Sequence, residues 1–356
     1  MKILALYLPA FHRIKENDEW WGEGFTEWDN VKKAKKLYKG HIQPQIPKDN
    51  NYYDLSKKEN IEKQIDLANK YKVDGFVFYH YWLNENHMLL EKPAELLKNE
   101  LKNKKIEYCF CWANQDWITT WHGKDIKTLL KQEYGKEDDW RKHIEYLIDF
   151  FKDERYTKID GRPVLFIYNV SKIKEYTEMI EYWNNYLNEQ GLKPIYTIEY
   201  IFSRNPQLSS KKSDGVMEFE PLYTTFFDIS FFNKAKRFFC KKILKCIDFQ
   251  NYDSLWKLIL KRDREYSDKT IFKSCFSAWD NSPRKEKNSM IVKNSTPKKF
   301  EKYLDELIKS KRKNTSDKYL VINAWNEWGE GAMLEPTEQD GYGYLEAIRK
   351  VVDKNE

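Results

Sequence analysis

The chain has 356 residues, a length that suits one large α/β barrel or two ordinary domains, and 41% of them are hydrophobic, as in a folded globular protein. Its 62 basic and 56 acidic residues leave a net charge of only +6, so composition gives no reason to expect a nucleic-acid partner. Aromatic residues make up 16% of the chain, which suggests that some of them line a binding site instead of the core.

Short apolar runs alternate with longer amphipathic stretches along almost the whole chain. The runs predict buried strands at 3–8, 75–81, 106–112, 163–168, 194–199, 215–219, 271–278 and 319–324. The amphipathic stretches predict helices at 57–72, 92–102, 138–152, 175–190, 254–264, 298–309 and 343–352. This alternation favours a single (β/α)8 TIM-type barrel over residues 1–356. The alternative is an open doubly wound sheet, which the missing glycine-rich loop after the first strand argues against.

Two long segments, 9–50 and 221–269, interrupt the rhythm. Both would leave the carboxyl-terminal ends of strands, where barrel enzymes place their active sites. We treat 221–269 as a loop insertion within the one domain. Inside it, Phe231–Phe249 mixes apolar and basic residues at helical spacing. The pattern favours a helix packed on the barrel with a solvated basic face, and the alternative is peripheral contact with an anionic membrane.

The five cysteines are odd in number and lack metal-binding spacing, while Cys109 and Cys111 alternate within a predicted strand as buried thiols would. This usage indicates a reducing compartment. We find no signal peptide and no apolar run long enough to span a bilayer. The sequence therefore predicts a cytoplasmic protein, at the inner face of the membrane if the basic helix binds lipid. It predicts no metal and no other cofactor.

The sharpest catalytic signal follows the last predicted strand, in the segment Asn326-Glu327-Trp328-Gly329-Glu330-Gly331. Strand periodicity places Glu327 at the rim of the barrel interior, and the glycines would let the chain turn so that Glu330 returns to the same cavity. Two neighbouring carboxylates differ in pKa, so one can donate a proton while the other is ionised, as glycosidic bond chemistry requires. The alternative is a pair of surface glutamates or a cap of the last helix.

Aromatic, amide and carboxylate residues collect at the carboxyl ends of the other predicted strands as well. We expect a glycan substrate to be bound by Tyr7, His12, Trp28, Tyr79, His80, Trp112, Asn114, Gln115, Asp116, Trp117, Glu199, Asp280, Asn323, Trp325 and Asn326. Some of them have a structural alternative: loop packing for Trp28, Trp112 and Trp117, as for Trp21 and Trp121, burial for His80, and capping of the following segment for Asp116 and Asp280. Structural ion pairing is favoured for Glu199, Glu218 and Glu220.

Ordered motifs also carry a family resemblance. They include Tyr7-Leu8-Pro9, Gly24-Phe25-Thr26-Glu27-Trp28, Gln43-Pro44, Tyr79-His80-Tyr81-Trp82, Trp112-Ala113-Asn114, Asp160-Gly161-Arg162-Pro163, Trp279-Asp280-Asn281 with Pro283-Arg284, and Asn323-Ala324-Trp325-Asn326-Glu327-Trp328. The chain resembles the WbsX-type glycosyltransferase-like family, which is related to the endo-α-mannosidase group of glycoside hydrolases. The resemblance implies a (β/α)8 barrel that acts on a bacterial surface polysaccharide of O-antigen or capsule type.

The same resemblance implies roles for the two carboxylates. Glu327 would be the base that assists the sugar 2-hydroxyl, and Glu330 the general acid/base at the leaving oxygen, with retention of configuration. Gln115 departs from the pattern, since the family commonly has a glutamate there. The favoured hypothesis is a glycoside hydrolase or transglycosidase. The alternatives are a glycosyltransferase using a lipid-linked or nucleotide donor, and an inactive glycan-binding barrel.

Overall fold

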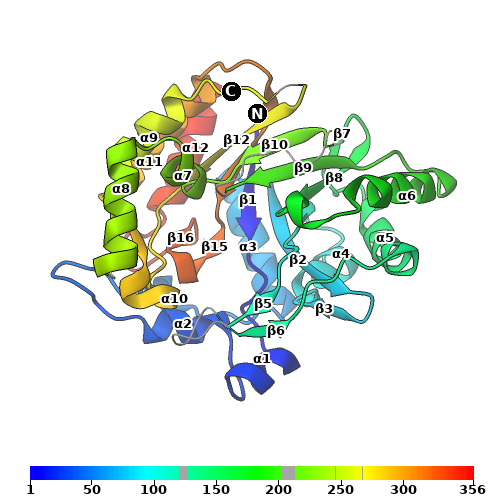
Figure 1. The fold of residues 1–356 in the computed structure, drawn as a ribbon, viewed down its shortest axis with the longest axis horizontal. Coiled ribbons are helices and arrows are strands. Elements are labelled where there is room, and N and C mark those ends of the chain that lie inside the picture. The colour runs from blue at the N-terminus through cyan, green and yellow to red at the C-terminus, as the bar shows by residue number, and fades with distance from the viewer. Residues whose placement is uncertain (120–126, 203–212, 245, 267) are drawn as a thin grey trace.

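The computed structural model describes residues 1–119, 127–202, 213–244, 246–266 and 268–356, and its centre is a closed barrel of parallel strands (Figure 1). The strands follow one another in the order β1, β14, β12, β10, β9, β8, β4 and β2, and β2 pairs back to β1. Their bounds are β1 Lys2–Tyr7, β2 Gly75–Asn84, β4 Glu107–Trp112, β8 Arg162–Ile167, β9 Tyr196–Ile201, β10 Gly215–Glu218, β12 Thr270–Phe276 and β14 Thr315–Asn323. The predicted (β/α)8 barrel and its eight predicted strands are confirmed.

The barrel strands are buried on both of their faces, which explains their continuous apolar sequences. In β1, Leu4 pairs with Val321 of β14 on one side and with Gly75 of β2 on the other. Every residue of β1 after Lys2 is buried. One face of such a strand fills the barrel and the other lies under the helices, so neither face selects for polar residues.

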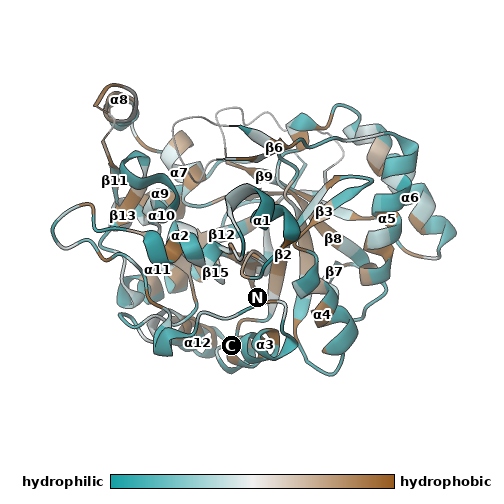
Figure 2. Cartoon of the chain, turned by 90° about the horizontal axis from the view of Figure 1, so that it is seen from below, coloured by the Kyte–Doolittle hydropathy of each residue, from teal (hydrophilic) through white to brown (hydrophobic). Residues whose placement is uncertain are grey.

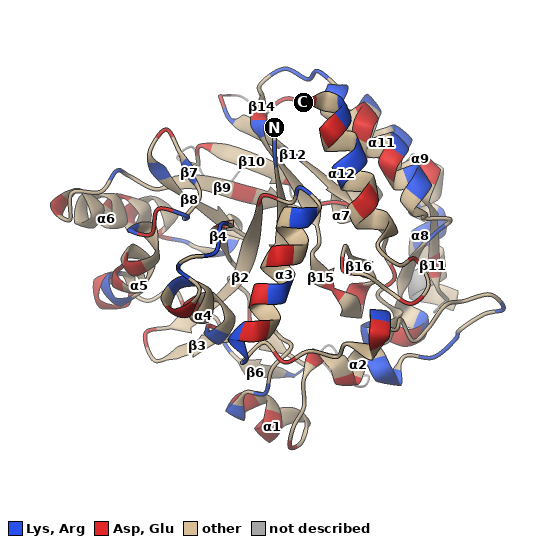
Figure 3. Ribbon diagram, turned by 180° about the vertical axis from the view of Figure 1, so that it is seen from behind, with Lys and Arg blue, Asp and Glu red and all other residues tan. Residues whose placement is uncertain are grey.

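Amphipathic helices cover the barrel at the positions that the sequence predicted. They are α3 (Lys58–Lys70), α4 (Lys92–Glu100), α5 (Glu137–Phe151), α6 (Tyr176–Glu189), α9 (Tyr252–Lys261), α11 (Pro297–Lys309) and α12 (Gly343–Asn355). The start of helix α11 is fixed by its own sequence: Thr296 accepts a hydrogen bond from the Lys299 amide, and Pro297 begins the first turn. Figure 3 shows acidic and basic residues alternating along the outer faces of α3 and α12.

Short elements fill the two long segments. Segment 9–50 contains α1 (Lys15–Trp21) and α2 (Glu27–Lys33), and segment 221–269 contains α7 (Leu222–Phe227), α8 (Phe231–Phe239), a π-helical turn (Cys240–Leu244) and β11 (Asp248–Asn251). The sequence did not predict the small pairings at the barrel ends. These pair β2 with β3 (His87–Leu89), β5 (Trp117–Ile118) with β6 (Thr128–Leu130), β7 (Lys158–Ile159) with β8, β11 with β13 (Met290–Lys293), and β15 (Asn326–Glu327) with β16 (Ala332–Met333).

Helix α8 contradicts one prediction. The apolar side of this basic amphipathic helix was expected to pack on the barrel, yet Phe231 and Phe232 are 79% and 83% exposed. Figure 2 shows α8 standing apart from the body of the molecule. Amphipathic spacing fixes that a helix has two faces, but it does not fix which face meets the protein.

The cysteines agree with the sequence in part. Cys109, Cys111 and Cys275 are free and buried, which confirms the buried thiols of the third predicted strand. Cys240 and Cys246, by contrast, form a disulfide with their Cα atoms 5.4 Å apart, and the sequence reading did not predict this pair. Within the described residues, no helix combines the length and apolar character needed to cross a membrane.

Candidate active site

Two glutamates and an arginine meet at the carboxyl-terminal end of the barrel. Glu327 ends β15 and Glu330 ends the 3-10 turn Trp328–Glu330, both just beyond barrel strand β14. Arg284 lies in α10 (Ser282–Lys285), just beyond barrel strand β12. Its Nη2 is 2.7 Å from Oε1 of Glu327, and its Nη1 is 3.4 Å from Oε1 of Glu330. The two carboxylates therefore converge on one guanidinium group.

A third carboxylate completes the arrangement from the first long segment. Glu27 begins α2, and its Oε1 accepts a hydrogen bond of 2.8 Å from Nε of Arg284. A capping box between Thr26 and Asp29 fixes the start of α2 and so holds Glu27 in place. Glu27 is fully enclosed, whereas the side chain of Glu330 is 21% exposed. The cluster therefore runs from the protein interior towards solvent, with Glu330 at its open side.

The glycines beside Glu330 are required by this packing. A Cβ atom at Gly329 would contact Oε1 of Glu27 and would lie 2.6 Å from Nε of Arg284, so a side chain there would disrupt their ion pair. Gly331 has a φ of +61°, and its missing side chain leaves room for the amide of Asp280, which donates to the Glu330 carbonyl at 2.7 Å. The turn predicted from these glycines does bring Glu330 back beside Glu327.

Burial and charge set the proton affinity of the site. Burial raises the pKa of Glu327 from 4.5 to about 8, opposed by the charge of Arg284 and assisted by the charges of Glu330 and Glu27. Burial alone would lower the pKa of Arg284, but Glu27, Glu327 and Glu330 outweigh it and raise the pKa instead. The site therefore combines the permanent positive charge of Arg284 with the carboxyl group of Glu327, which holds its proton near neutral pH. Once ionised, Glu327 is a stronger base than an exposed glutamate.

Aromatic side chains border the carboxylates and continue towards the surface. Tyr79 and Tyr81 alternate with buried residues on β2. Burial is the main cause that raises the pKa of each tyrosine, and the charge of Glu327 is a smaller one. From Tyr81 the row continues to Trp117, with ring centroids 5.2 Å apart, and then to Trp20 at 6.2 Å. Both tryptophans are partly exposed. Such a row can stack against the apolar faces of sugar rings.

A further tyrosine, Tyr168, follows β8 and borders the same carboxylates from another direction. Burial is the largest cause that raises the pKa of Tyr168, the charge of Glu330 is the next, and the charge of Glu327 makes a smaller contribution. Its ring lies 4.4 Å from that of Phe202 and 5.6 Å from that of Tyr200. Of the residues predicted to bind substrate, the structure thus groups Tyr79 and Trp117 with Glu327 and Glu330.

Three predicted amides are used to join the ends of strands. Asn326 accepts from the Leu8 amide at 2.7 Å and donates to the Leu8 carbonyl at 3.0 Å. Asn114 bonds both the amide and the carbonyl of Asn169 at 2.8 Å. Asn323 donates to the Glu220 carbonyl at 2.9 Å. Asn326 and Asn114 thus link the ends of neighbouring barrel strands, and Asn323 links β14 to the end of β10, on the far side of β12.

His80 and Trp112 lie in the layer between the barrel and α5. His80 Nε2 is 2.9 Å from Nε2 of His143 on α5, and burial lowers the pKa of His80 to about 3. Trp112 donates to the Trp82 carbonyl at 2.9 Å. His12 is also buried, with its pKa lowered by burial, and it borders a separate cavity of about 310 Å³. His80 and Trp112 are thus buried against other protein groups, as the burial and packing alternatives predicted for them.

Tyr7, Trp28 and Trp325 are buried in the packing beneath the site. Tyr7 donates to Gln64 at 2.6 Å, Trp28 donates to the Tyr53 carbonyl at 2.8 Å, and the Trp325 ring packs 5.0 Å from that of Phe76.

The remaining predicted residues lie at other strand ends. Gln115 and Asp116 are exposed just beyond β4, and Asp116 accepts from the Gln132 amide at 2.8 Å. Asp280 is held by Nε2 of His41 at 2.7 Å and Nε2 of Gln43 at 2.8 Å. Trp121 falls outside the described residues.

The carboxylates for which ion pairing was favoured do form ion pairs. Glu199 accepts from Ser213 and lies 3.5 Å from Nζ of Lys269. Glu218 and Glu220 both bind Arg262, at 2.7 and 2.8 Å. All of these carboxylates are buried, so the cations offset the cost of removing their charges from water.

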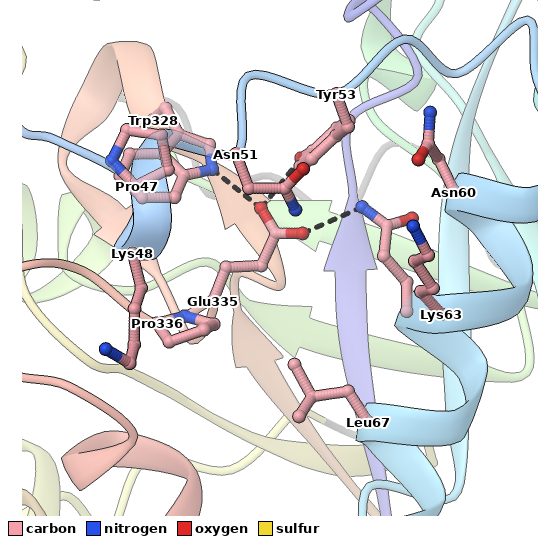
Figure 4. Close-up of a pocket in the computed structure, with 11 residues that line it drawn as sticks. Pro47, Lys48, Asn51, Tyr53, Asn60, Lys63, Leu67, Trp328, Glu335 and Pro336 are labelled. Carbon is pink, nitrogen blue, oxygen red and sulfur yellow. Dashed lines mark hydrogen bonds between the residues drawn. The ribbon is translucent and has the colours of Figure 1, made fainter.

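Sequence reasoning did not assign roles to Arg284, Glu27 or Glu335. Arg284 and Glu27 were part of quoted motifs, but no local pattern reveals that residues so far apart in the chain share one site. Glu335 follows β16 and binds three donors: the Tyr53 hydroxyl at 2.7 Å, Nε2 of Gln64 at 2.7 Å and Nε1 of Trp328 at 2.6 Å. Figure 4 shows it beside a small pocket of about 80 Å³.

Through Trp328, Glu335 supports the turn that carries Glu327 and Glu330. Burial raises the pKa of Glu335 from 4.5 to about 7, although its hydrogen bonds lower it. The folded state therefore binds a proton that the unfolded state releases, so this group's contribution to stability is complete below its ordinary pKa and is lost as pH rises through about 7.

We expect Glu335→Gln to flatten the pH dependence of unfolding. Between about pH 5 and pH 8 the wild-type unfolding free energy should fall about 3 kcal/mol further than that of the variant. Urea unfolding across this range measures the difference. The exposed Glu346→Gln should keep the wild-type slope. Equal slopes for all three proteins would show that Glu335 is ionised throughout.

The comparisons with known proteins agree with this fold. Residues 3–348 match the model of the glycosyltransferase WbsX family. The chain is 30% identical to the uncharacterised protein WxcX of Xanthomonas campestris pv. campestris (strain B100), over 99% of this chain and 50% of that protein. The chain thus spans about half the length of the curated relative that it matches.

Two solved structures share the fold at low identity. One is the GH99 endo-α-mannosidase from Bacteroides thetaiotaomicron, at a TM-score of 0.57 and 16% identity, covering 99% of this chain and 96% of that one. The other is a glycoside hydrolase-like protein, at a TM-score of 0.62 and 14% identity, covering 98% and 93%. The family model covers nearly all of the chain, from the first barrel strand to the last helix, and the chain therefore belongs to the WbsX glycosyltransferase family.

Proposed function

We propose that this protein is a carbohydrate-active enzyme that cleaves or transfers a glycosidic bond of a bacterial surface polysaccharide, of O-antigen or capsule type. The observation that carries the proposal is the convergence of buried Glu327 and partly exposed Glu330 on Arg284, at the carboxyl end of a closed barrel. Membership of the WbsX family supports a glycan as the substrate. The fold shared with an endo-α-mannosidase supports an α-mannoside as the first linkage to test.

In the proposed mechanism Glu327 is the base and Glu330 the acid. Glu327 takes the proton of the sugar 2-hydroxyl while O2 attacks C1, and Glu330 gives a proton to the oxygen that leaves C1. Water, or a sugar hydroxyl, then attacks C1 and gives its proton to Glu330, while O2 takes its proton back from Glu327. Two inversions at C1 retain the configuration, and no bond to the enzyme forms. This differs from the usual retaining mechanism, in which a carboxylate attacks C1.

The environment of Glu327 fits the role of base. Burial makes its carboxylate a stronger base than an exposed glutamate, and Arg284 stabilises the ionised form that must be present before the reaction. Glu330 lies at the open side, where a leaving group and a water molecule can reach it. Arg284 itself touches both carboxylates and so positions them relative to each other.

Transfer to a sugar acceptor is the second candidate, because the family to which the chain belongs is described as glycosyltransferases. Transfer from a lipid-linked donor could use the same carboxylates, since only the attacking oxygen differs. We expect the enzyme to work in the cytoplasm, without a metal or another cofactor.

The test is to incubate the protein with the surface polysaccharide of its source bacterium and to analyse the products by mass spectrometry and proton NMR. New reducing ends of retained anomeric configuration would support hydrolysis, and longer chains formed from an activated donor would support transfer. A glycan that is bound by both the wild type and Glu330→Gln but yields no product with the wild type would identify an inactive glycan-binding barrel instead.

A further inference from the structure

The insertion between β10 and β12 exposes an unusual concentration of large apolar side chains. Six of them lie on α8 and the π-helical turn that continues it, with exposures from 49% to 83%: Phe231, Phe232, Phe238, Phe239, Ile243 and Leu244. A monomer in water rarely leaves such a contiguous apolar surface uncovered, so this surface is suited to binding something.

Polar contacts hold the helix to the body from its opposite side. Arg237 forms an ion pair with Asp248 on β11, donates to the Thr225 carbonyl at 2.6 Å, and lies 4.9 Å from the Phe226 ring. At the edge of the apolar side, Lys234 donates to the Phe227 carbonyl at 3.0 Å. The apolar side chains are thus directed away from the protein by the way in which the helix is anchored.

A cavity of about 1000 Å³ separates α8 from α9, so the helix stands off the body, as Figure 2 also shows. The residues that α8 contributes to this cavity are Asn233, Lys236 and Arg237. Cys240, which begins the π-helical turn after α8, lines it too. None of the exposed phenylalanines of α8 is among its lining residues. The polar side of the helix therefore faces the protein, and the apolar side faces outwards.

The angular order of the side chains supports this orientation. At about 100° per residue, the apolar residues fall within an arc of about 120°: Phe238, Phe231, Ala235, Phe239 and Phe232. Lys234 and Lys236 lie on the two sides of this arc, and Arg237 lies nearly opposite its centre. Lysines in flanking positions can extend their ammonium groups along the edges of an apolar surface.

Charge identifies the kind of surface that fits. Residues 231–246 contain six lysines and arginines and no aspartate or glutamate, and the whole chain has a net charge of only +6. We infer that α8 binds the surface of an anionic lipid membrane. Its phenylalanines enter the boundary between headgroups and acyl chains, and Lys234 and Lys236, at the two edges of the apolar arc, add electrostatic attraction to the anionic surface.

The inferred contact would place the barrel opening close to the lipid. The insertion leaves the carboxyl end of β10, and β11 pairs with β13, which follows the helix that carries Arg284. Helix α8 and the candidate active site are therefore carried by loops at the same end of the barrel. The membrane contact does not depend on the proposed chemistry, because it involves different residues.

Sedimentation with vesicles tests the inference. At low salt the wild type should sediment with vesicles of phosphatidylcholine and phosphatidylglycerol, and weakly or not at all with phosphatidylcholine alone. Phe231→Ser with Phe232→Ser should lower the partition coefficient about tenfold or more, because two inserting side chains are lost. Lys234→Glu with Lys236→Glu should lower it about thirtyfold or more, because each lysine near an anionic surface adds attraction.

Matched variants separate local from general effects. Lys102→Glu with Lys105→Glu makes the same change of net charge at exposed residues of the loop between α4 and β4, at the other end of the barrel, and should bind vesicles like the wild type. Circular dichroism checks that every variant is folded. The inference would be overturned if the wild type did not sediment with anionic vesicles at low salt. It would also be overturned if the two double-lysine variants lost vesicle binding to the same extent. Self-association in analytical ultracentrifugation without lipid, lost on changing the phenylalanines, would assign the surface to a second copy of the chain instead.

Discussion

Glu327→Gln and Glu330→Gln are each expected to lower kcat/KM about 10²–10⁴-fold, the usual size of a general acid or base contribution. The amide keeps the shape of the side chain but can neither give nor take the proton. The reason to expect large effects from both is that they converge on Arg284, at 2.7 and 3.4 Å, and that the proposed mechanism uses both at one reaction centre. Initial rates of polysaccharide cleavage or transfer measure the change, and glycan binding should persist in both variants.

The exposed Glu338→Gln, eight residues beyond Glu330, serves as the matched control and should keep wild-type activity. The pH profile of the wild type then separates the two roles. If Glu327 is the base, activity rises with pH as its carboxyl ionises, with a midpoint near 8. Because the general acid must be protonated, activity also falls once Glu330 ionises, so the roles are exchanged only if the falling limb, and not the rising limb, has its midpoint near 8. Full activity of Glu330→Gln would contradict the proposed mechanism.

Arg262→Met is expected to lower the free energy of unfolding by about 3–5 kcal/mol, because it leaves buried carboxylates without their cation. Its guanidinium binds Glu218 at 2.7 Å, Glu220 at 2.8 Å and Asp228 at 2.8 Å from Nε, and only 5% of the Arg262 side chain is exposed. The methionine would retain most of the volume of the side chain, so the loss reports on charge pairing more than on packing. Urea denaturation at neutral pH measures it.

Arg349→Met provides the comparison. Half of the Arg349 side chain is exposed, and its ion pair with Asp353 is 3.7 Å long, so its loss should change stability by less than about 0.5 kcal/mol. Similar small effects for both arginines would show that water or Arg312, which also binds Glu218 at 2.8 Å, replaces Arg262.

The barrel could be predicted from the sequence because both faces of each strand are buried, which leaves continuous apolar runs such as Ile3–Tyr7 that are easy to find. The convergence of Glu327 and Glu330 could be predicted because the two residues are close in sequence and the glycines beside Glu330 reveal the turn. Each of these signals is local, so no knowledge of the other strands is needed to recognise it.

Residues whose roles depend on distant partners could not be assigned in the same way. Arg284 binds Glu27, which lies 257 residues earlier in the chain, and nothing near either residue in the sequence indicates the other. His80 looked like a ligand of sugar hydroxyls because it ends a strand, but on β2 it points to the opposite face from Tyr79 and meets His143 on α5. For Asn326, Asn323 and Asn114 the sequence carried no sign of their hydrogen bonds to backbone groups, since amides at strand ends satisfy groups that the ladder leaves unpaired.

Closure of the barrel has a consequence for how the polypeptide is made. Strand β1 can pair with β2 soon after both have left the ribosome, but its second neighbour is β14, almost the entire chain later. Until then β1 retains an open edge, and so does β12, which also pairs with β14. A product that ends before Thr315 would be an open sheet in which β1 and β12 each keep an unpaired edge, so it would be prone to aggregate. It would also lack Glu327 and Glu330.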